Sequence, residues 1–199
     1  MRDSNLILTR SPGNRLLHML IGVGGKWWPL ICLLLMCNTP IQAQSGSKEH
    51  QLKAAFLFNF TKFVEWDAAS FDSPDAPLVI GILGSNAFGN EVEHAVKGRK
   101  VNGRPLVVRK LRSAGEARGT HLLFISSEED GHAAGIINSV RGAPVLTVGE
   151  SAAFARAGGA ITFAIESGKV RFDINTTAAE RASVRISSQL QKLARSVNR

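Results

Sequence analysis

The sequence predicts a single-domain α/β fold: a mostly parallel sheet of about six strands, helices on both faces, and a C-terminal antiparallel hairpin. Four near-continuous apolar runs of strand length alternate with turns and short helical segments, at residues 78–83, 104–109, 121–125 and 144–148. Strands that are apolar on both sides are typical of a parallel sheet covered by helices. Two further strand-like runs, 160–166 and 169–174, are separated only by Ser167-Gly168, which predicts a tight hairpin.

Residues 1–43 have the order of a secretory signal peptide. Basic residues come first, an apolar run follows from Trp27 to Met36, and a polar approach ends at the small residue Ala43. That run is shorter than the roughly 17–25 residues that span a bilayer. We therefore expect export, cleavage after Ala43, and a folded domain over 44–199. An uncleaved anchor is the alternative, and a lipoprotein acylated at Cys37 is disfavoured because Met36 precedes it.

Composition narrows the classes of function for the exported part. Both cysteines, Cys32 and Cys37, leave with the signal, so the remaining 156 residues hold no disulfide and no cysteine metal site. The signal carries four Lys/Arg and one Asp, so its removal lowers the formal net charge from +8 to +5. A mildly basic domain suits an acidic partner or a membrane surface. Nucleic acid is a poor candidate partner for an exported protein.

An amphipathic helix is expected over residues 48–66. Its apolar positions recur at steps of three and four, and Phe58 and Val64 widen the apolar face: Leu52, Ala55, Phe56, Phe60, Phe63 and Trp66. One small domain need not bury so wide a face. We therefore predict that part of it, with Phe58, Lys62 and Trp66 as candidates, contacts a partner or a second copy.

The motifs of common enzymes are absent from the sequence. The histidines of the exported part, at positions 50, 94, 121 and 132, lack metal-ligand spacing, and no Gly-x-Ser-x-Gly nucleophile motif occurs. Gly84 to Gly89 has phosphate-loop glycine spacing, but Asn90-Glu91 stands where Lys and Ser/Thr are needed. We expect no catalytic residue, no metal and no cofactor.

The turn after the first sheet strand remains a candidate ligand site. Gly84, Ser85 and Asn86 join a strand end to a helix N-terminus, where free N–H groups can meet an anion. In open α/β sheets, ligands favour the crevice at the carboxyl ends of the strands. The alternative is a tight connection with no ligand.

Two basic clusters have alternative interpretations. The first cluster lies between Glu93 and Glu116, a stretch that contains no acidic residue. Its members are Lys97, Arg99, Lys100, Arg104, Arg109, Lys110 and Arg112. It is either a solvated edge that discourages aggregation or a surface for phospholipid head groups or an acidic partner. The second cluster would border a pocket and hold a carboxylate or phosphate, unless its arginines pair with Asp173 and Glu180. Its members are Arg171, Phe172, Asn175, Arg181 and Arg185.

Capping boxes mark four helices. Ser113-x-x-Glu116, Ser126-x-x-Glu129, Thr177-x-x-Glu180 and Ser188-x-x-Gln191 each predict a side-chain cap at a helix N-terminus. The last helix would present Leu190, Leu193, Ala194 and Val197 as its apolar positions.

The ordered set of segments resembles the YfiR-like family of periplasmic proteins across essentially the whole exported chain. The similar segments are Lys53–Trp66, Ile80–Gly84 with Phe88-Gly89, Val101–Leu106, His121–Ser126, Pro144–Val148, Val170–Asn175, Arg181-Ala182, Arg185–Ser187 and Leu190. No single motif among them is specific to the family, but their order is.

The resemblance implies a non-enzymatic periplasmic regulator. Family members repress an inner-membrane diguanylate cyclase by binding its periplasmic part, which lowers cyclic di-GMP and biofilm formation. The resemblance also implies a homodimer, an outer-membrane-linked sequestering partner and a small aromatic or nucleotide-like ligand. Disulfides of well-studied members have no counterpart here, so redox control does not carry over. The alternative is a small-ligand sensor serving another membrane receptor, such as a sensor kinase.

Overall fold

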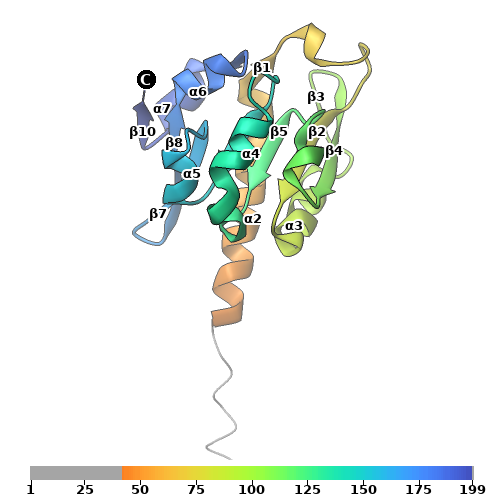
Figure 1. The fold of residues 1–199 in the computed structure, drawn as a ribbon. Coiled ribbons are helices and arrows are strands. Elements are labelled where there is room, and N and C mark those ends of the chain that lie inside the picture. Colours follow the sequence, from red (N-terminus) through yellow and green to blue (C-terminus); the bar gives the residue numbers. More distant parts are fainter. Residues whose placement is uncertain (1–41, 199) are drawn as a thin grey trace, which may run out of the picture. The chain divides into compact units, whose positions relative to one another are not determined.

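An eight-stranded sheet forms the centre of the computed structural model, which describes residues 42–198 (Figure 1). The strands lie in the order β10-β8-β7-β6-β5-β2-β4-β3. Their bounds are β2 Leu78–Leu83, β3 Lys100–Val101, β4 Arg104–Leu111, β5 Leu122–Ile125, β6 Leu146–Gly149, β7 Ile161–Glu166, β8 Lys169–Asn175 and β10 Ser196–Asn198. The expected signal sequence lies outside the described residues, except at its last two positions. Within the described part, no helix has the length and apolar character needed to cross a bilayer.

The pairing confirms the predicted α/β class. Strands β4, β2, β5, β6 and β7 are mutually parallel, whereas β8 pairs antiparallel with β7 through the predicted hairpin. The sheet has two strands more than expected because β3 and β10 extend its edges. Both are short and lack a long apolar run, so the sequence pattern did not reveal them.

Helices cover both faces of the sheet. Helices α2 (Gln42–Phe63) and α3 (Asn86–Val96) lie on one face, and α4 (Ala133–Ser139) and α5 (Ala152–Arg156) lie on the other. Successive side chains of β5 point to opposite faces of the sheet. Leu122 and Phe124 pack in the core under α2 and α3, and Leu123 and Ile125 pack in the core under α4 and α5. Short elements complete the chain: η1 Ala68–Ser70, η2 Ala114–Ala117, η3 Ser127–His132, α6 Thr176–Arg181 and α7 Ser188–Leu193.

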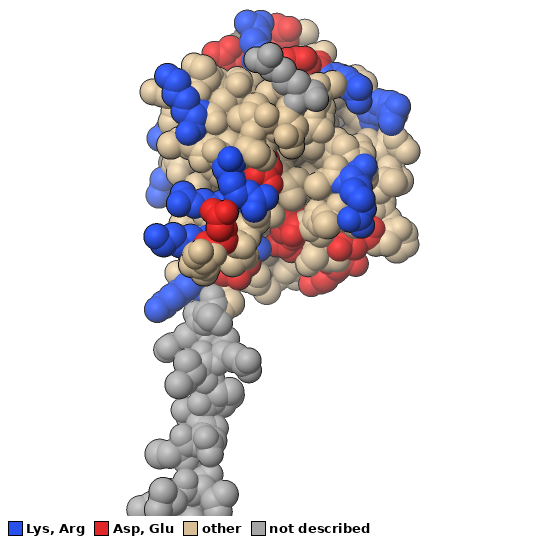
Figure 2. Space-filling model, turned by 90° about the vertical axis from the view of Figure 1, so that its left-hand side faces the viewer, with Lys and Arg blue, Asp and Glu red and all other residues tan. Residues whose placement is uncertain are grey.

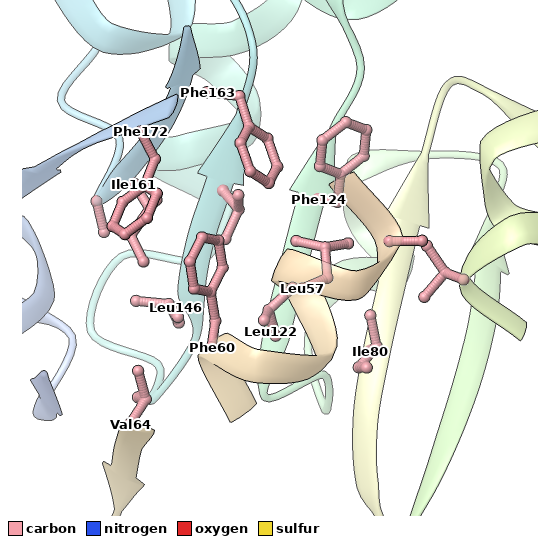
Figure 3. Close-up of a cluster of buried hydrophobic side chains, with 14 of the residues drawn as sticks. Leu57, Phe60, Val64, Ile80, Leu122, Phe124, Leu146, Ile161, Phe163 and Phe172 are labelled. Carbon is pink, nitrogen blue, oxygen red and sulfur yellow. The ribbon is translucent and has the colours of Figure 1, made fainter. Parts of the chain in front are cut away.

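Aromatic packing fixes α2 on the sheet (Figure 3). The Phe60 ring lies 5.7 Å from the Phe163 ring and 5.1 Å from the Phe172 ring, between centroids. Leu57 and Phe60 are fully buried against strand residues such as Leu122. The helix therefore forms one wall of the main core.

The helix predicted over residues 48–66 differs from α2 at both ends, since α2 begins at Gln42, and in its buried face. The helix ends at Phe63, and Val64–Trp66 forms strand β1, which pairs antiparallel with β9 (Val184–Ile186). The apolar residues that α2 buries are Ala54, Leu57 and Phe60, whereas Leu52 is 45% exposed. The apolar side chains of this helix point in nearly all directions around its axis, so their spacing did not specify which side faces the sheet.

The helix caps near the C-terminus also differ from prediction. Asn175, rather than Thr177, caps α6, since its Oδ1 accepts a hydrogen bond from the Ala178 amide at 3.0 Å. Ser187 caps α7, and this helix ends at Leu193 instead of continuing to Val197. Ser113 makes no side-chain cap. At α6 and α7 the miss reflects neighbouring Ser, Thr and Asn side chains that can each serve as the cap.

Candidate functional site

The first candidate site lies where the direction of sheet growth reverses. From β2 the chain passes through α3 to β4 on one side, and then crosses to β5 on the other side. The carboxyl ends of β2 and β5 therefore flank a topological switch point, the usual ligand crevice of such folds. A small pocket of about 140 Å³ lies there, which we call the carboxyl-edge pocket; its lining includes His50, Ser85, Ser126, Ser127 and Glu150.

An ion pair joins α2 to this edge. The Lys53 ammonium lies 2.7 Å from the Glu150 carboxylate and 2.5 Å from that of Glu49, and the Lys53 side chain is only 7% exposed. Glu150 also accepts hydrogen bonds from the Ser127 amide at 3.0 Å and the Ser127 hydroxyl at 3.1 Å. Polar groups from α2, the β5 end and the β6 end thus meet in one cluster.

The electrostatics of the cluster favour the charged pair. Burial would lower the pKa of Lys53, but the hydrogen bonds and charges of Glu150 and Glu49 outweigh it, so the Lys53 pKa lies above its usual value. Burial would likewise raise the pKa of Glu150, yet Lys53 and Ser127 hold it below the usual value. Both groups are therefore ionised at neutral pH and stabilise each other.

The predicted turn Gly84, Ser85 and Asn86 lies at this edge. Gly84 has φ of +100°, and a Cβ there would lie 2.7 Å from the Ser126 Cβ, so the turn requires glycine. Ser85 caps α3, since its hydroxyl accepts from the Phe88 amide at 3.4 Å. Asn86 begins α3 and is exposed. The turn thus has a structural role, and a ligand role remains a prediction.

A second pocket lies beside the β1–β9 ribbon and has a volume of about 420 Å³. It brings together two residues singled out from the sequence, Trp66 and Arg185, which we use to name it the Trp66–Arg185 pocket. Three carboxylates, Glu65, Asp67 and Glu180, also line it. Because carboxylates outnumber the one guanidinium in this lining, the charge of the pocket disfavours a simple anion as its ligand.

The Trp66 ring is held in place by a histidine that the sequence did not single out. Its Nε1 donates a hydrogen bond to the His121 carbonyl at 3.1 Å. The buried His121 ring accepts from the Val79 amide through Nδ1 and stacks on Phe71, with centroids 4.3 Å apart. Arg104 in turn lies 3.7 Å above the Phe71 ring. Burial, aided by the charge of Arg104, lowers the pKa of His121 below its usual value.

The second predicted cluster is divided among separate places. Arg185 lines the Trp66–Arg185 pocket, Arg181 lines another pocket with Ile137 and Arg141, and Arg171 lines neither. Phe172 is 2% exposed in the main core, and Asn175 caps α6. Figure 2 shows the side that carries α6, α7, β8 and β10, where basic side chains are spread out with acidic ones between them.

Of the two acidic partners expected for these arginines, Asp173 pairs with another residue, and Glu180 lines the same pocket as Arg185 but forms no ion pair within the described residues. Asp173 forms a two-pronged ion pair with Arg195, with Nε to Oδ1 at 2.9 Å, and this hydrogen bond lowers the Asp173 pKa. The pair ties β8 to the segment between α7 and β10. Arg195 could not be identified as the partner because it lies 22 residues away in the sequence.

The remaining candidates on α2 lie at its surface. Phe58 is half-buried, and the Arg99 guanidinium lies 4.4 Å above its ring while the exposed Lys62 ammonium lies 5.6 Å from it. Attraction between these cations and the ring helps to hold the Phe58 side chain in place at the protein surface. Among the described residues, no group of three or more His, Cys, Asp and Glu side chains could hold a metal ion.

Comparison with protein families identifies the chain. A model of the YfiR/HmsC-like family (DUF4154) matches residues 50–195, a range that extends from α2 to the start of β10. The chain therefore belongs to the YfiR/HmsC-like family, as the resemblance of its segments predicted. This family groups periplasmic regulators associated with diguanylate cyclase systems rather than enzymes. A comparison with curated proteins gave no match.

Two solved structures match this chain with low sequence identity and low TM-scores. A conserved domain protein from Vibrio cholerae O1 biovar El Tor has 12% identity and a TM-score of 0.48, over 61% of this chain and 55% of that one. An ABC domain in complex with L-Trp from Streptococcus pneumoniae has 14% identity and a TM-score of 0.43, over 60% and 54%. The chain thus spans about half the length of each of these structures.

Proposed function

We propose that this protein is a periplasmic repressor that binds the periplasmic part of an inner-membrane diguanylate cyclase and so lowers cyclic di-GMP output and biofilm formation. The observation that carries the proposal is the family match, which spans nearly the whole described domain. Export follows from the order of basic, apolar and small residues in 1–43. The proposed assembly includes a homodimer and an outer-membrane-linked partner that sequesters the repressor.

The surface formed by the end of α2 and by β1 supports a role in protein contact. Phe58 and Trp66 are half-buried, and Lys62 is exposed beside them on the same stretch of chain. Partly exposed aromatic rings flanked by cations are common at protein interfaces. We assign Phe58, Lys62 and Trp66 to the partner-binding surface.

The test measures cyclic di-GMP in cells that lack the gene and carry either the wild-type or a variant copy. Phe58→Glu is expected to raise cyclic di-GMP to the level of the deletion strain, while the purified variant stays folded. Leu193→Glu is the matched control, because Leu193 is 63% exposed on α7 and lies outside this surface. Equal cyclic di-GMP in the wild-type, deletion and Phe58→Glu strains would overturn the proposal.

A small-ligand sensor serving another membrane receptor, such as a sensor kinase, is the second candidate function. The Trp66–Arg185 pocket favours it, because this hollow of about 420 Å³ is lined by polar and charged residues that include Arg185. A small aromatic or nucleotide-like ligand would hydrogen-bond to the exposed Arg185 guanidinium. Unchanged cyclic di-GMP together with ligand binding to the purified protein, lost in Arg185→Lys, would favour the sensor.

A further inference from the structure

The outer edge of β4 lacks a strand along most of its length (Figure 1). On its inner side, residues 106–111 pair with β2 throughout. On its outer side, the two-residue strand β3 pairs only with Arg104 and Pro105. Within the described residues, the stretch from Val107 to Leu111 therefore presents an open strand edge, which can accept another strand.

The direction of the backbone groups along this edge follows from one hydrogen bond. The Leu106 amide donates to the Arg99 carbonyl at 3.2 Å, so Leu106 points outward, away from β2. Backbone groups alternate between the two sides of an extended strand. The amides and carbonyls of Val108 and Lys110 therefore also point outward, in the pattern that an added strand requires.

A groove adjoins the open edge. It has a volume of about 650 Å³ and lies between α3 and β4. Its apolar lining includes Val96, Leu106 and Val108, and its polar lining includes Glu93, His94 and Lys97. Alternate side chains of a strand added to β4 would point into this groove. The edge can therefore provide both backbone pairing and side-chain contacts.

The positive charge around the β4 edge indicates which residues an added strand should carry. Seven basic residues occur between Glu93 and Glu116 with no acidic residue among them. Only Lys110 forms an ion pair within the described residues, with Glu93 at 3.2 Å. Lys97, Lys100 and Arg112 are exposed. An extended segment rich in Asp or Glu is the complementary occupant.

A second copy of this chain fits the edge less well. In a symmetric dimer the same surface meets itself, so the basic residues along one β4 edge would face those along the other. Like charges placed opposite each other on paired strands are destabilising. The charge pattern therefore disfavours edge-to-edge self-association at β4.

We propose that the β4 edge and the groove beside α3 dock an extended acidic segment of another protein, which adds to the sheet as a strand. The backbone of Val108 and Lys110 supplies the pairing, and the surrounding Lys and Arg side chains supply the attraction. The proposal does not depend on the identity of the membrane partner.

The probe is a blocked peptide of alternating Glu and Val about as long as the open edge, titrated into the ¹⁵N-labelled protein. Binding is expected to slow hydrogen exchange of the Val108 and Lys110 amides by about tenfold or more at saturation. A peptide with N-methyl groups on its edge-facing amides keeps the charge but cannot pair, and it is expected not to slow this exchange. No binding, or protection at β10 in place of β4, would overturn the proposal.

Charge-reversal variants test the basic residues. Lys97→Glu with Lys100→Glu is expected to weaken peptide binding by about tenfold, because two attractive contacts become repulsive. The control, Lys169→Glu with Lys192→Glu, reverses two exposed lysines near the opposite end of the sheet and is expected to change affinity by less than about twofold. Equal affinity for the N-methylated peptide would show an anion-attracting surface, as for a membrane, and would also overturn strand addition.

Discussion

Replacement of Glu150 by Ala tests whether the carboxyl-edge cluster holds α2 on the domain. The Glu150 carboxylate contacts the Lys53 ammonium at 2.7 Å and accepts two hydrogen bonds from Ser127. Lys53 is 7% exposed, so water cannot fully replace the lost carboxylate. Its remaining partner is Glu49, one helical turn earlier on α2.

The expected loss of stability follows from these contacts. Ser127 is exposed, so water can replace its bonds to Glu150 at little cost. The Lys53 contact is a charge-assisted hydrogen bond, and its loss at a mostly buried cation costs about 2–3 kcal/mol. For a domain of this size, each kcal/mol lowers Tm by roughly 2–4 °C, so we expect a fall of roughly 4–12 °C.

The assay is thermal unfolding of the wild type, Glu150→Ala and Glu128→Ala at several pH values. Glu128 lines the same pocket but is exposed, so its removal is expected to cost less than about 0.5 kcal/mol. The folded pKa of Glu150 lies below its ordinary value of 4.5, so its contribution is complete above that value and is lost as pH falls through the folded pKa. The difference between wild type and Glu150→Ala should therefore shrink in acid. Equal unfolding temperatures for the two variants at neutral pH would refute the reasoning.

Three further outcomes are expected. Phe60→Ala should lower the free energy of unfolding by about 3–5 kcal/mol in a denaturant titration, because this ring is fully buried among aromatic neighbours; a loss below about 1 kcal/mol would contradict the core assignment. Arg185→Lys should weaken binding of the membrane partner by about tenfold with little change in Tm, because Lys lacks the planar fork of Arg. The control Arg156→Lys, at an exposed residue of α5, should change neither the affinity nor Tm. The folded pKa of His121 lies below 6.5, so wild-type stability should fall as pH drops below 6.5, and a His121→Gln variant should show a weaker fall.

The sequence was sufficient for the fold class because its signals are local. The central strands are near-continuous apolar runs, and Ser167-Gly168 closes the hairpin between β7 and β8. The edge strands β3 and β10 are too short to give such a signal, since they form only where β4 and β8 already offer backbone partners.

The candidate sites were predictable only in part, and the reason lies in sequence distance. Ser85 and Glu150 follow apolar strands directly, so their place at the carboxyl edge could be read from the pattern of strands. The pairing of Glu150 with Lys53 could not, because it joins residues 97 positions apart. The arginines at positions 171, 181 and 185 show the converse, because they are close in the sequence but lie in different places. Arg181 and Arg185 line different pockets, and Arg171 lines neither of them.

The sequence by itself determined the order of strands and helices and the family to which the chain belongs, because the alternation of apolar runs, turns and caps is encoded locally. Tertiary structure decided which face of α2 is buried, which acid holds Lys53, and that Trp66 and Arg185 share a pocket. Those outcomes depend on which surfaces meet when the sheet, β1 and β9 assemble, and that packing is specified by the whole chain rather than by any one segment.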